Sequence, residues 1–291
     1  MQQRIGFCST ADGVRIAYAT VGTGPAVLVA QFSPSHIGLE WEEPRVRDFW
    51  EAVGRHHLVV RYDKHGCGLS DRNRTDFSLD SEVRTIEAIV RELGLKAPVL
   101  WGQGAQGAVA AIAYAVKSPD RVSRLILCGA HARWHGLSPL AADDLRGQDA
   151  FRTLTLSNPR MASLALAEGM LGSALDASAL QWWLRIWQEG VTPEMNDEIL
   201  AHIRKIDVRD LLPKVRAPTL IVHYRNDRIV PFEAGRELAA GIQGARFVPL
   251  EGDAHIFYFN DTRPLRRAIA EFLGDPIEEA RQSFTDAAKV R

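Results

Sequence analysis

The chain has 291 residues, of which 46% are hydrophobic and 24% charged, the composition of a globular protein and not of a disordered or fibrous chain. Its 35 Lys and Arg residues nearly balance its 36 Asp and Glu residues, and the net charge is −1. The two signs are interleaved, which excludes a field that would hold nucleic acid or an anionic membrane. The length suits one large domain with an insertion, or two domains.

The cysteine content indicates a reducing compartment. Cys8, Cys67 and Cys128 are widely spaced and form neither a disulfide framework nor a zinc motif. The first residues lack the apolar region of a signal peptide, and no run reaches the roughly 18 apolar residues of a membrane span. We therefore expect a cytoplasmic protein. No metal ligands occur at a recognisable spacing, so neither a metal nor a cofactor is expected.

Apolar runs alternate with amphipathic segments along most of the chain. Residues 5–21 predict an antiparallel hairpin with its turn at Ala11-Asp12-Gly13. The runs typical of buried strands follow at residues 27–30, 58–62, 99–101, 125–128, 219–223 and 246–250. Helical patterns lie at residues 81–93, 107–117, 233–242 and 264–273. This alternation predicts an α/β fold with a doubly wound, mostly parallel sheet.

One long segment, residues 131–215, interrupts this alternation. It contains no convincing strand, only helical patterns at residues 141–155, 161–170, 177–188 and 193–204. We predict a core formed by residues 1–130 and 216–291, with residues 131–215 as a helical lid. Trp183 and Trp187 share one face of a lid helix, where aromatic residues serve either packing or substrate contact. We expect residues 275–291 to form a polar tail of helical character.

Catalytic residues of open α/β sheets follow the carboxyl ends of strands. After the run at residues 99–101 comes Gly102-Gln103-Gly104-Ala105-Gln106-Gly107, which leads directly into a helix. Its glycines match the dinucleotide fingerprint G-x-G-x-x-G. That motif requires an acidic residue at the end of the next strand, whereas the sequence there is Leu127-Cys128-Gly129-Ala130. The context therefore disfavours a dinucleotide site.

The alternative is a nucleophile elbow, in which a strained turn between strand and helix presents the reactive residue. The chain resembles the α/β-hydrolase fold superfamily nearly throughout, from the hairpin to Leu273. The run at residues 110–122 and the loop at residues 63–71 carry the likeness, together with the elbow. Counting back from Pro119, the resemblance implies Ala105 as the nucleophile position; counting forward from the strand implies Gly104. Neither has a nucleophilic atom.

The resemblance also implies the other members of a catalytic triad, in the expected chain order. Asp227, four residues before a proline, is similar to the family's acid, and His255 resembles its general base. Asp253 is a poorer acid because it lies on the histidine's own loop. The oxyanion hole would consist of the backbone N–H groups of Phe32 and Gln106.

The expected function is that of a serine-type hydrolase of an apolar or aromatic ester or lactone, here without its nucleophile. Ala105 has three explanations: an introduced Ser→Ala change, a natural loss that leaves a binding protein, or lyase or isomerase chemistry that needs no nucleophile. A dinucleotide-binding oxidoreductase is a further alternative. Trp134, Trp183 and Trp187 are expected to contact the small apolar substrate. A homodimer is left open.

Overall fold

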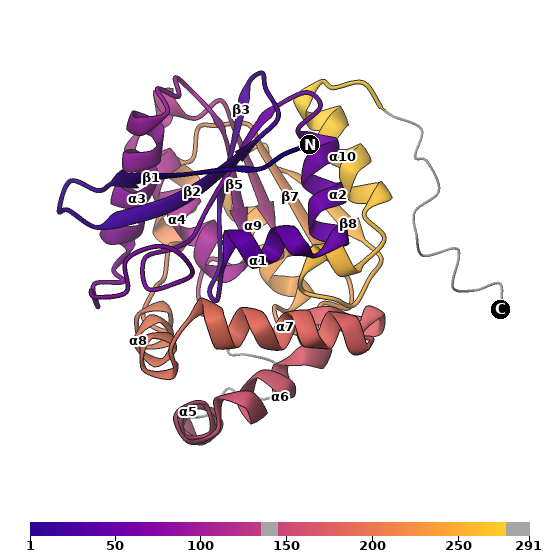
Figure 1. Cartoon of the computed structure of the whole chain (residues 1–291). Helices are drawn as coiled ribbons and strands as arrows, with labels where there is room; N and C mark the ends of the chain where they lie inside the picture. Colours follow the sequence, from indigo (N-terminus) through magenta and orange to yellow (C-terminus); the bar gives the residue numbers. More distant parts are fainter. Residues whose placement is uncertain (135–144, 278–291) are drawn as a thin grey trace.

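An eight-stranded sheet lies at the centre of the computed structural model, which describes residues 1–134 and 145–277 (Figure 1). The strands are β1 (Arg4–Ser9), β2 (Arg15–Val21), β3 (Ala26–Ala30), β4 (Leu58–Tyr62), β5 (Val99–Gln103), β6 (Arg124–Cys128), β7 (Thr219–Tyr224) and β8 (Arg246–Leu250). Their order across the sheet is β1-β2-β4-β3-β5-β6-β7-β8. Strands β3 to β8 are parallel, and β2 joins them antiparallel to β4. The predicted mostly parallel sheet is confirmed.

The predicted N-terminal hairpin is also confirmed. Strands β1 and β2 pair antiparallel, with Arg4 opposite Thr20 and Ser9 opposite Arg15. The turn between them contains Gly13 at φ +84, a left-handed conformation that glycine adopts without steric cost.

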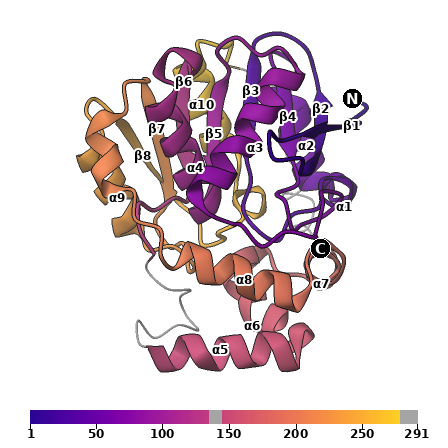
Figure 2. The same cartoon turned by 90° about the vertical axis from the view of Figure 1, so that its left-hand side faces the viewer.

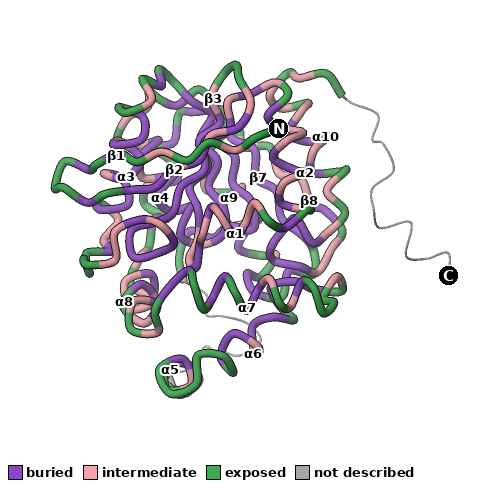
Figure 3. Tube along the Cα trace, in the orientation of Figure 1, coloured by how far each residue is buried: buried purple, intermediate pink, exposed green. Residues whose placement is uncertain are grey.

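Helices cover both faces of the sheet (Figure 2). One face is covered by α3 (Leu79–Glu92), α4 (Gly104–Lys117) and α9 (Phe232–Gly241), and the other by α2 (Pro44–Val53) and α10 (Arg263–Leu273). Side chains alternate between the two cores along each strand: Leu28 belongs to one, and Val27 and Val29 to the other. The central strands are buried on both faces (Figure 3), and β3 (Ala-Val-Leu-Val-Ala) is accordingly apolar throughout.

An insertion separates β6 from β7, and its described part contains four α-helices. They are α5 (Leu145–Ser157), α6 (Pro159–Leu171), α7 (Ala177–Gly190) and α8 (Pro193–Ile203), which lie together beside one end of the sheet (Figures 1 and 2). These helices agree with the four helical patterns in the sequence. Residues 141–144 of the first pattern lie outside the described residues, as do residues 278–291 of the expected polar tail.

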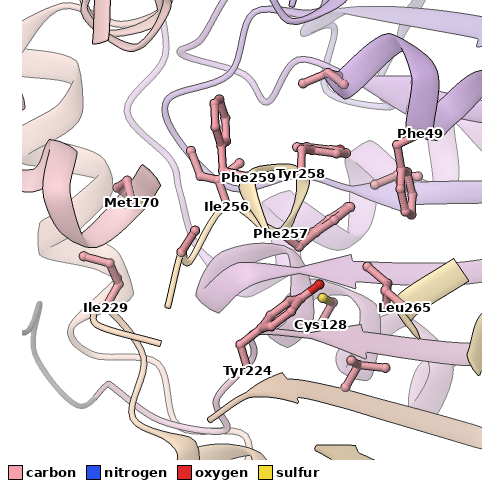
Figure 4. Close-up of a cluster of buried hydrophobic side chains, with 14 of the residues drawn as sticks. Phe49, Cys128, Met170, Tyr224, Ile229, Ile256, Phe257, Tyr258, Phe259 and Leu265 are labelled. Carbon is pink, nitrogen blue, oxygen red and sulfur yellow. The ribbon is translucent and has the colours of Figure 1, made fainter. Parts of the chain in front are cut away.

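The insertion is fastened to the core by packing and by hydrogen bonds. Met170 of α6 and Ile229 of the loop after β7 belong to the same buried cluster as the aromatic residues of the 3₁₀ turn Phe257–Phe259 (Figure 4). Trp182 Nε1 donates to the carbonyl of Leu39 at 3.1 Å. The Asp253 carboxylate accepts from the Ser173 N–H at 3.0 Å.

Two helices have no counterpart in the sequence-based prediction: α1 (Ile37–Glu42) and α2. Both begin at polar caps. The His36 ring accepts from the Leu39 N–H, and the Glu43 carboxylate accepts from the Arg45 N–H, with Pro44 at the first helical position. The remaining short turns are 3₁₀ helices at Pro119–Arg121, Gly172–Ala174 and Arg209–Lys214.

Candidate active site

The turn between β5 and α4 is a sharp elbow, and close packing explains why glycine stands at two of its positions. A Cβ on Gly102 would lie 2.6 Å from the Ala108 Cα, and one on Gly107 would overlap the carbonyl oxygen of Ala30. Both glycines therefore let helix and strand approach each other closely. The match to a dinucleotide fingerprint is explained without a bound phosphate.

Gly104 is the residue at the apex of this elbow. It follows β5 directly and has φ +62, in the left-handed region. A Cβ built on it would lie 3.4 Å from His255 Nε2 and 3.3 Å from the Phe32 Cβ. A side chain at position 104 would therefore point at the imidazole. Ala105, favoured by counting back from Pro119, lies one residue further along, within the first turn of α4.

His255 and Asp227 form a buried pair after the last two strands, as the resemblance implied. His255 Nδ1 lies 2.9 Å from Asp227 Oδ2, and the two side chains are 5% and 0% exposed. The other carboxylate oxygen of Asp227 accepts the N–H groups of Ile229 and Val230. The carboxylate is thus held in place by backbone donors and orients the ring.

The electrostatics of this pair favour an ionised Asp227 carboxylate. Burial raises the pKa of Asp227, but the charge and hydrogen bond of His255 outweigh burial and hold that pKa below its usual value. With Nδ1–H donating to Asp227, the lone pair of His255 Nε2 is available as a base. Within the described part of the chain, Nε2 has no hydrogen-bond partner.

Asp253 has a different role, in agreement with its rejection as the acid. Its carboxylate accepts from Ser173 and from Arg228, which lies 3.1 Å away.

His223 is a neighbour of Asp227 that the sequence did not indicate. It lies 3.7 Å from Asp227, and burial lowers the pKa of its ring, which keeps it neutral.

The loop after β4 supports the site without entering it. Buried Asp63 accepts the N–H groups of Ile37 at 2.8 Å and Leu69 at 2.9 Å, and burial raises the pKa of this carboxyl to about 7. Cys67 Sγ of the same loop lies 3.3 Å from the Ser33 Oγ. The loop thereby positions the segment after β3, which contains Phe32 and Ser33.

A cavity of about 50 Å³ lies between the core and the insertion, over His255. The core contributes Phe32, Ser33, Ala105, Gln106, Ile229, Val230 and His255 to its walls. The segment between β6 and β7 contributes His131, Trp134, Phe151, Leu166, Met170, Trp187, Asn196, Leu200 and Ile203. Side chains of the insertion and His255 therefore line the same cavity. Most of the wall is apolar, and none of the described residues that form it is acidic.

The three predicted substrate-contacting tryptophans occupy two kinds of environment. Trp134 and Trp187 line the cavity beside His255. Trp183 does not line it: its ring is 1% exposed, and its Nε1 donates to the Ser163 carbonyl at 2.8 Å. The structure adds Ser33 and Asn196 to the cavity wall, which no sequence pattern singled out.

Several buried polar atoms near the cavity have no hydrogen-bond partner among the residues that the structure describes. They include Gln106 Oε1 and the ring N–H groups of Trp134 and Trp187. In the described ranges, no cluster of three or more His, Cys, Asp or Glu side chains is arranged to hold a metal ion. No helix in residues 1–134 or 145–277 has the length and apolarity to cross a membrane.

The strand order, the elbow after β5 and the His–Asp pair after β8 and β7 are the architecture of hydrolases with a Ser-Asp-His type of site. The model of the alpha/beta hydrolase fold family matches residues 37–262. The chain belongs to this family.

Individual relatives agree with this assignment. The chain is 29% identical to the AB hydrolase superfamily protein YisY of Bacillus subtilis over 91% of this chain and 98% of that protein. It is 24% identical to the bifunctional esterase/perhydrolase DCH of Acinetobacter calcoaceticus over 92% and 99%. Among solved structures, an esterase from Exiguobacterium antarcticum superposes with a TM-score of 0.80 at 20% identity, covering 92% of this chain and 99% of that one. The family is therefore one of hydrolases, esterases among them.

Proposed function

We propose that this chain binds a neutral, largely apolar ester- or lactone-like molecule over the His255–Asp227 pair and forms no acyl-enzyme, because Gly104 stands at the nucleophile position. The single observation that carries this proposal is the direction of a side chain at position 104, whose Cβ would lie 3.4 Å from His255 Nε2. In this family's chemistry that is the place of the serine. The nucleophile position is thereby Gly104, the second of the two positions that the sequence left open, and not Ala105.

The rest of the machinery is in place around this glycine. A serine there would pass its proton to His255 Nε2 while its oxygen attacks the carbonyl, and Asp227 would stabilise the imidazolium. The oxyanion donors move with the nucleophile by one residue, from the backbone N–H of Gln106 to that of Ala105, alongside that of Phe32. The apolar cavity wall supports an uncharged substrate.

The test compares two serines, Gly104→Ser and Ala105→Ser, on p-nitrophenyl acetate, butyrate and hexanoate. Removing a triad serine costs on the order of 10⁶ in kcat, so Gly104→Ser should gain several orders of magnitude over the unchanged chain, with a burst of p-nitrophenol. Ala105→Ser should remain inert.

The partners of the restored serine supply the control. In the Gly104→Ser background, His255→Ala should abolish turnover, and Asp227→Asn should lower kcat by about 10⁴ because the ring loses its tautomer. If Ala105→Ser hydrolysed the esters and Gly104→Ser did not, residue 105 would be the nucleophile position. Ordinary esterase rates from the unchanged chain would overturn the whole proposal.

A second candidate function is proton transfer by His255 without any nucleophile, as in a lyase or isomerase. The observation that favours it is the free lone pair of His255 Nε2 beside an intact Asp227. The measurement is deuterium exchange at the carbon next to the carbonyl of a bound methyl ketone in D₂O. Exchange that His255→Ala removes supports this function, and exchange no faster than in buffer rejects it.

A further inference from the structure

A second and larger cavity, of about 430 Å³, lies within the insertion. Its walls include Thr155, Arg160 and Ser163 from α5 and α6, and Val191 from the turn after α7. Trp187 of α7 and Asn196 of α8 line both this outer cavity and the inner one over His255. These two residues, here called the neck, therefore form the boundary between the cavities.

The neck is where unused hydrogen-bond donors gather. Trp187 Nε1 and Asn196 Nδ2 are both buried and have no partner among residues 1–134 and 145–277; the two residues are 8% and 3% exposed. The other two indoles of α7 are bonded: Trp182 donates to Leu39 and Trp183 to Ser163. A buried donor without a partner is costly to the fold, so two of them on one boundary call for an acceptor.

Other polar groups of the outer cavity are already engaged. The Thr155 hydroxyl donates to the Phe151 carbonyl, and the Ser163 hydroxyl donates to the Arg160 carbonyl. In the described part of the chain, neither cavity is lined by an Asp, Glu or Lys side chain. Arg160 and Gln188 also line the outer cavity, and among the described residues Trp134 Nε1 is an unpaired donor on the inner wall. The two unpaired donors on the boundary between the cavities are those of the neck.

We propose that one ligand occupies both cavities, with its carbonyl group over His255 and its acyl chain passing the neck. The acyl chain of this ligand carries an oxygen atom that accepts hydrogen bonds from Trp187 Nε1 and Asn196 Nδ2. The ligand class is a neutral ester or lactone with a keto or ether oxygen in its acyl part. This inference rests on the proposed function for the position of the carbonyl group. It adds Asn196 and Trp187 as the residues that select the acyl part.

The test measures binding of phenyl heptanoate and its 4-, 5- and 6-oxo analogues to the unchanged chain by calorimetry. One oxo ester should bind at least about 3- to 10-fold more tightly than phenyl heptanoate, because each of its two neutral hydrogen bonds contributes on that order. Trp187→Phe keeps an aromatic ring of smaller size, and Asn196→Leu replaces the amide by an apolar side chain of the same branching; both remove the donor. Each substitution should lower the ratio of the two dissociation constants, for phenyl heptanoate and for the oxo ester, toward 1.

Trp182→Phe is the matched control, because it makes the same change on the same helix at an indole that is already bonded to Leu39. It should keep the preference for the oxo ester. Asn196→Leu should also leave the melting temperature unchanged or higher, since it removes an unpaired buried amide. A preference that survives both neck substitutions, or that Trp182→Phe also removes, would overturn the inference.

The neck and the proposed function fail in different ways. If Gly104→Ser hydrolyses esters but no oxo ester is preferred by the unchanged chain, the neck inference falls alone. If an oxo ester is preferred through Trp187 and Asn196 while Gly104→Ser is inert, the proposed function falls and the neck remains a binding site.

Discussion

Gly104→Ala is expected to destabilise the protein, although it adds only one methyl group. Gly104 has φ +62, where a residue with a Cβ costs about 1–2 kcal/mol. The new Cβ would also lie 3.3 Å from the Phe32 Cβ and 3.4 Å from His255 Nε2, contacts that shifts of a few tenths of an ångström relieve. We expect the free energy of unfolding to fall by about 1–3 kcal/mol in all.

Gly94→Ala provides the matched control for the conformational part of this cost. Gly94 has φ +61, and a Cβ built there meets nothing within 4 Å. The control should therefore lose about 1 kcal/mol from backbone conformation alone. The excess loss in Gly104→Ala then measures how firmly a side chain at the elbow presses on Phe32 and His255.

Urea unfolding of the three proteins, analysed with a common slope, gives these differences directly. Gly104→Ala as stable as the unchanged chain, beside a loss of about 1 kcal/mol in Gly94→Ala, would refute a left-handed residue at the elbow. If Gly104→Ala lowered the free energy of unfolding by far more than about 3 kcal/mol, the new methyl group would be clashing with its neighbours. That result would refute the contact distances to Phe32 and His255.

Two further predictions concern the interior. Trp183→Ala should lower the free energy of unfolding by about 3–5 kcal/mol in the same urea assay, because the buried ring and its bond to Ser163 are both lost; a cost below about 1 kcal/mol would mean that the ring is not packed. Burial raises the pKa of Cys8 and of Cys67 to about 11 and that of Cys128 further. A thiol reagent at pH 8 should therefore label the folded protein very slowly and label all 3 cysteines after unfolding in urea, and rapid labelling of the folded protein would contradict this burial.

The sequence predicted the acid and the base because each follows a recognisable strand. Asp227 and His255 stand after β7 and β8, and parallel strands bring their carboxyl ends to one edge of the sheet. The elbow was ambiguous because Gly104 and Ala105 are both small and adjacent. Which of them has positive φ depends on where β5 ends, and a count of residues fixes helix boundaries only to within a few positions.

Other parts of the site depend on contacts that have no sequence signature. Trp183 and Trp187 share a helix face, and their rings lie 5.8 Å apart, yet one packs inward while the other lines both cavities. Asn196 is an ordinary polar residue of an amphipathic helix until the fold buries its amide without a partner. Helices α1 and α2 were missed because their starts depend on side-chain caps by His36 and Glu43 and not on a long periodic pattern.

The left-handed glycine at the elbow has a genetic consequence. The glycine codons GGT and GGC become the serine codons AGT and AGC by one base change, and the backbone at position 104 already has the conformation that the elbow requires. A serine at position 104 would have a strained backbone conformation, and a glycine does not. Replacing serine by glycine at this position therefore stabilises the fold. The reverse step needs no new backbone geometry. Under the function proposed above, a binding protein and a hydrolase differ here by one substitution, and its cost in stability is the strain of one residue.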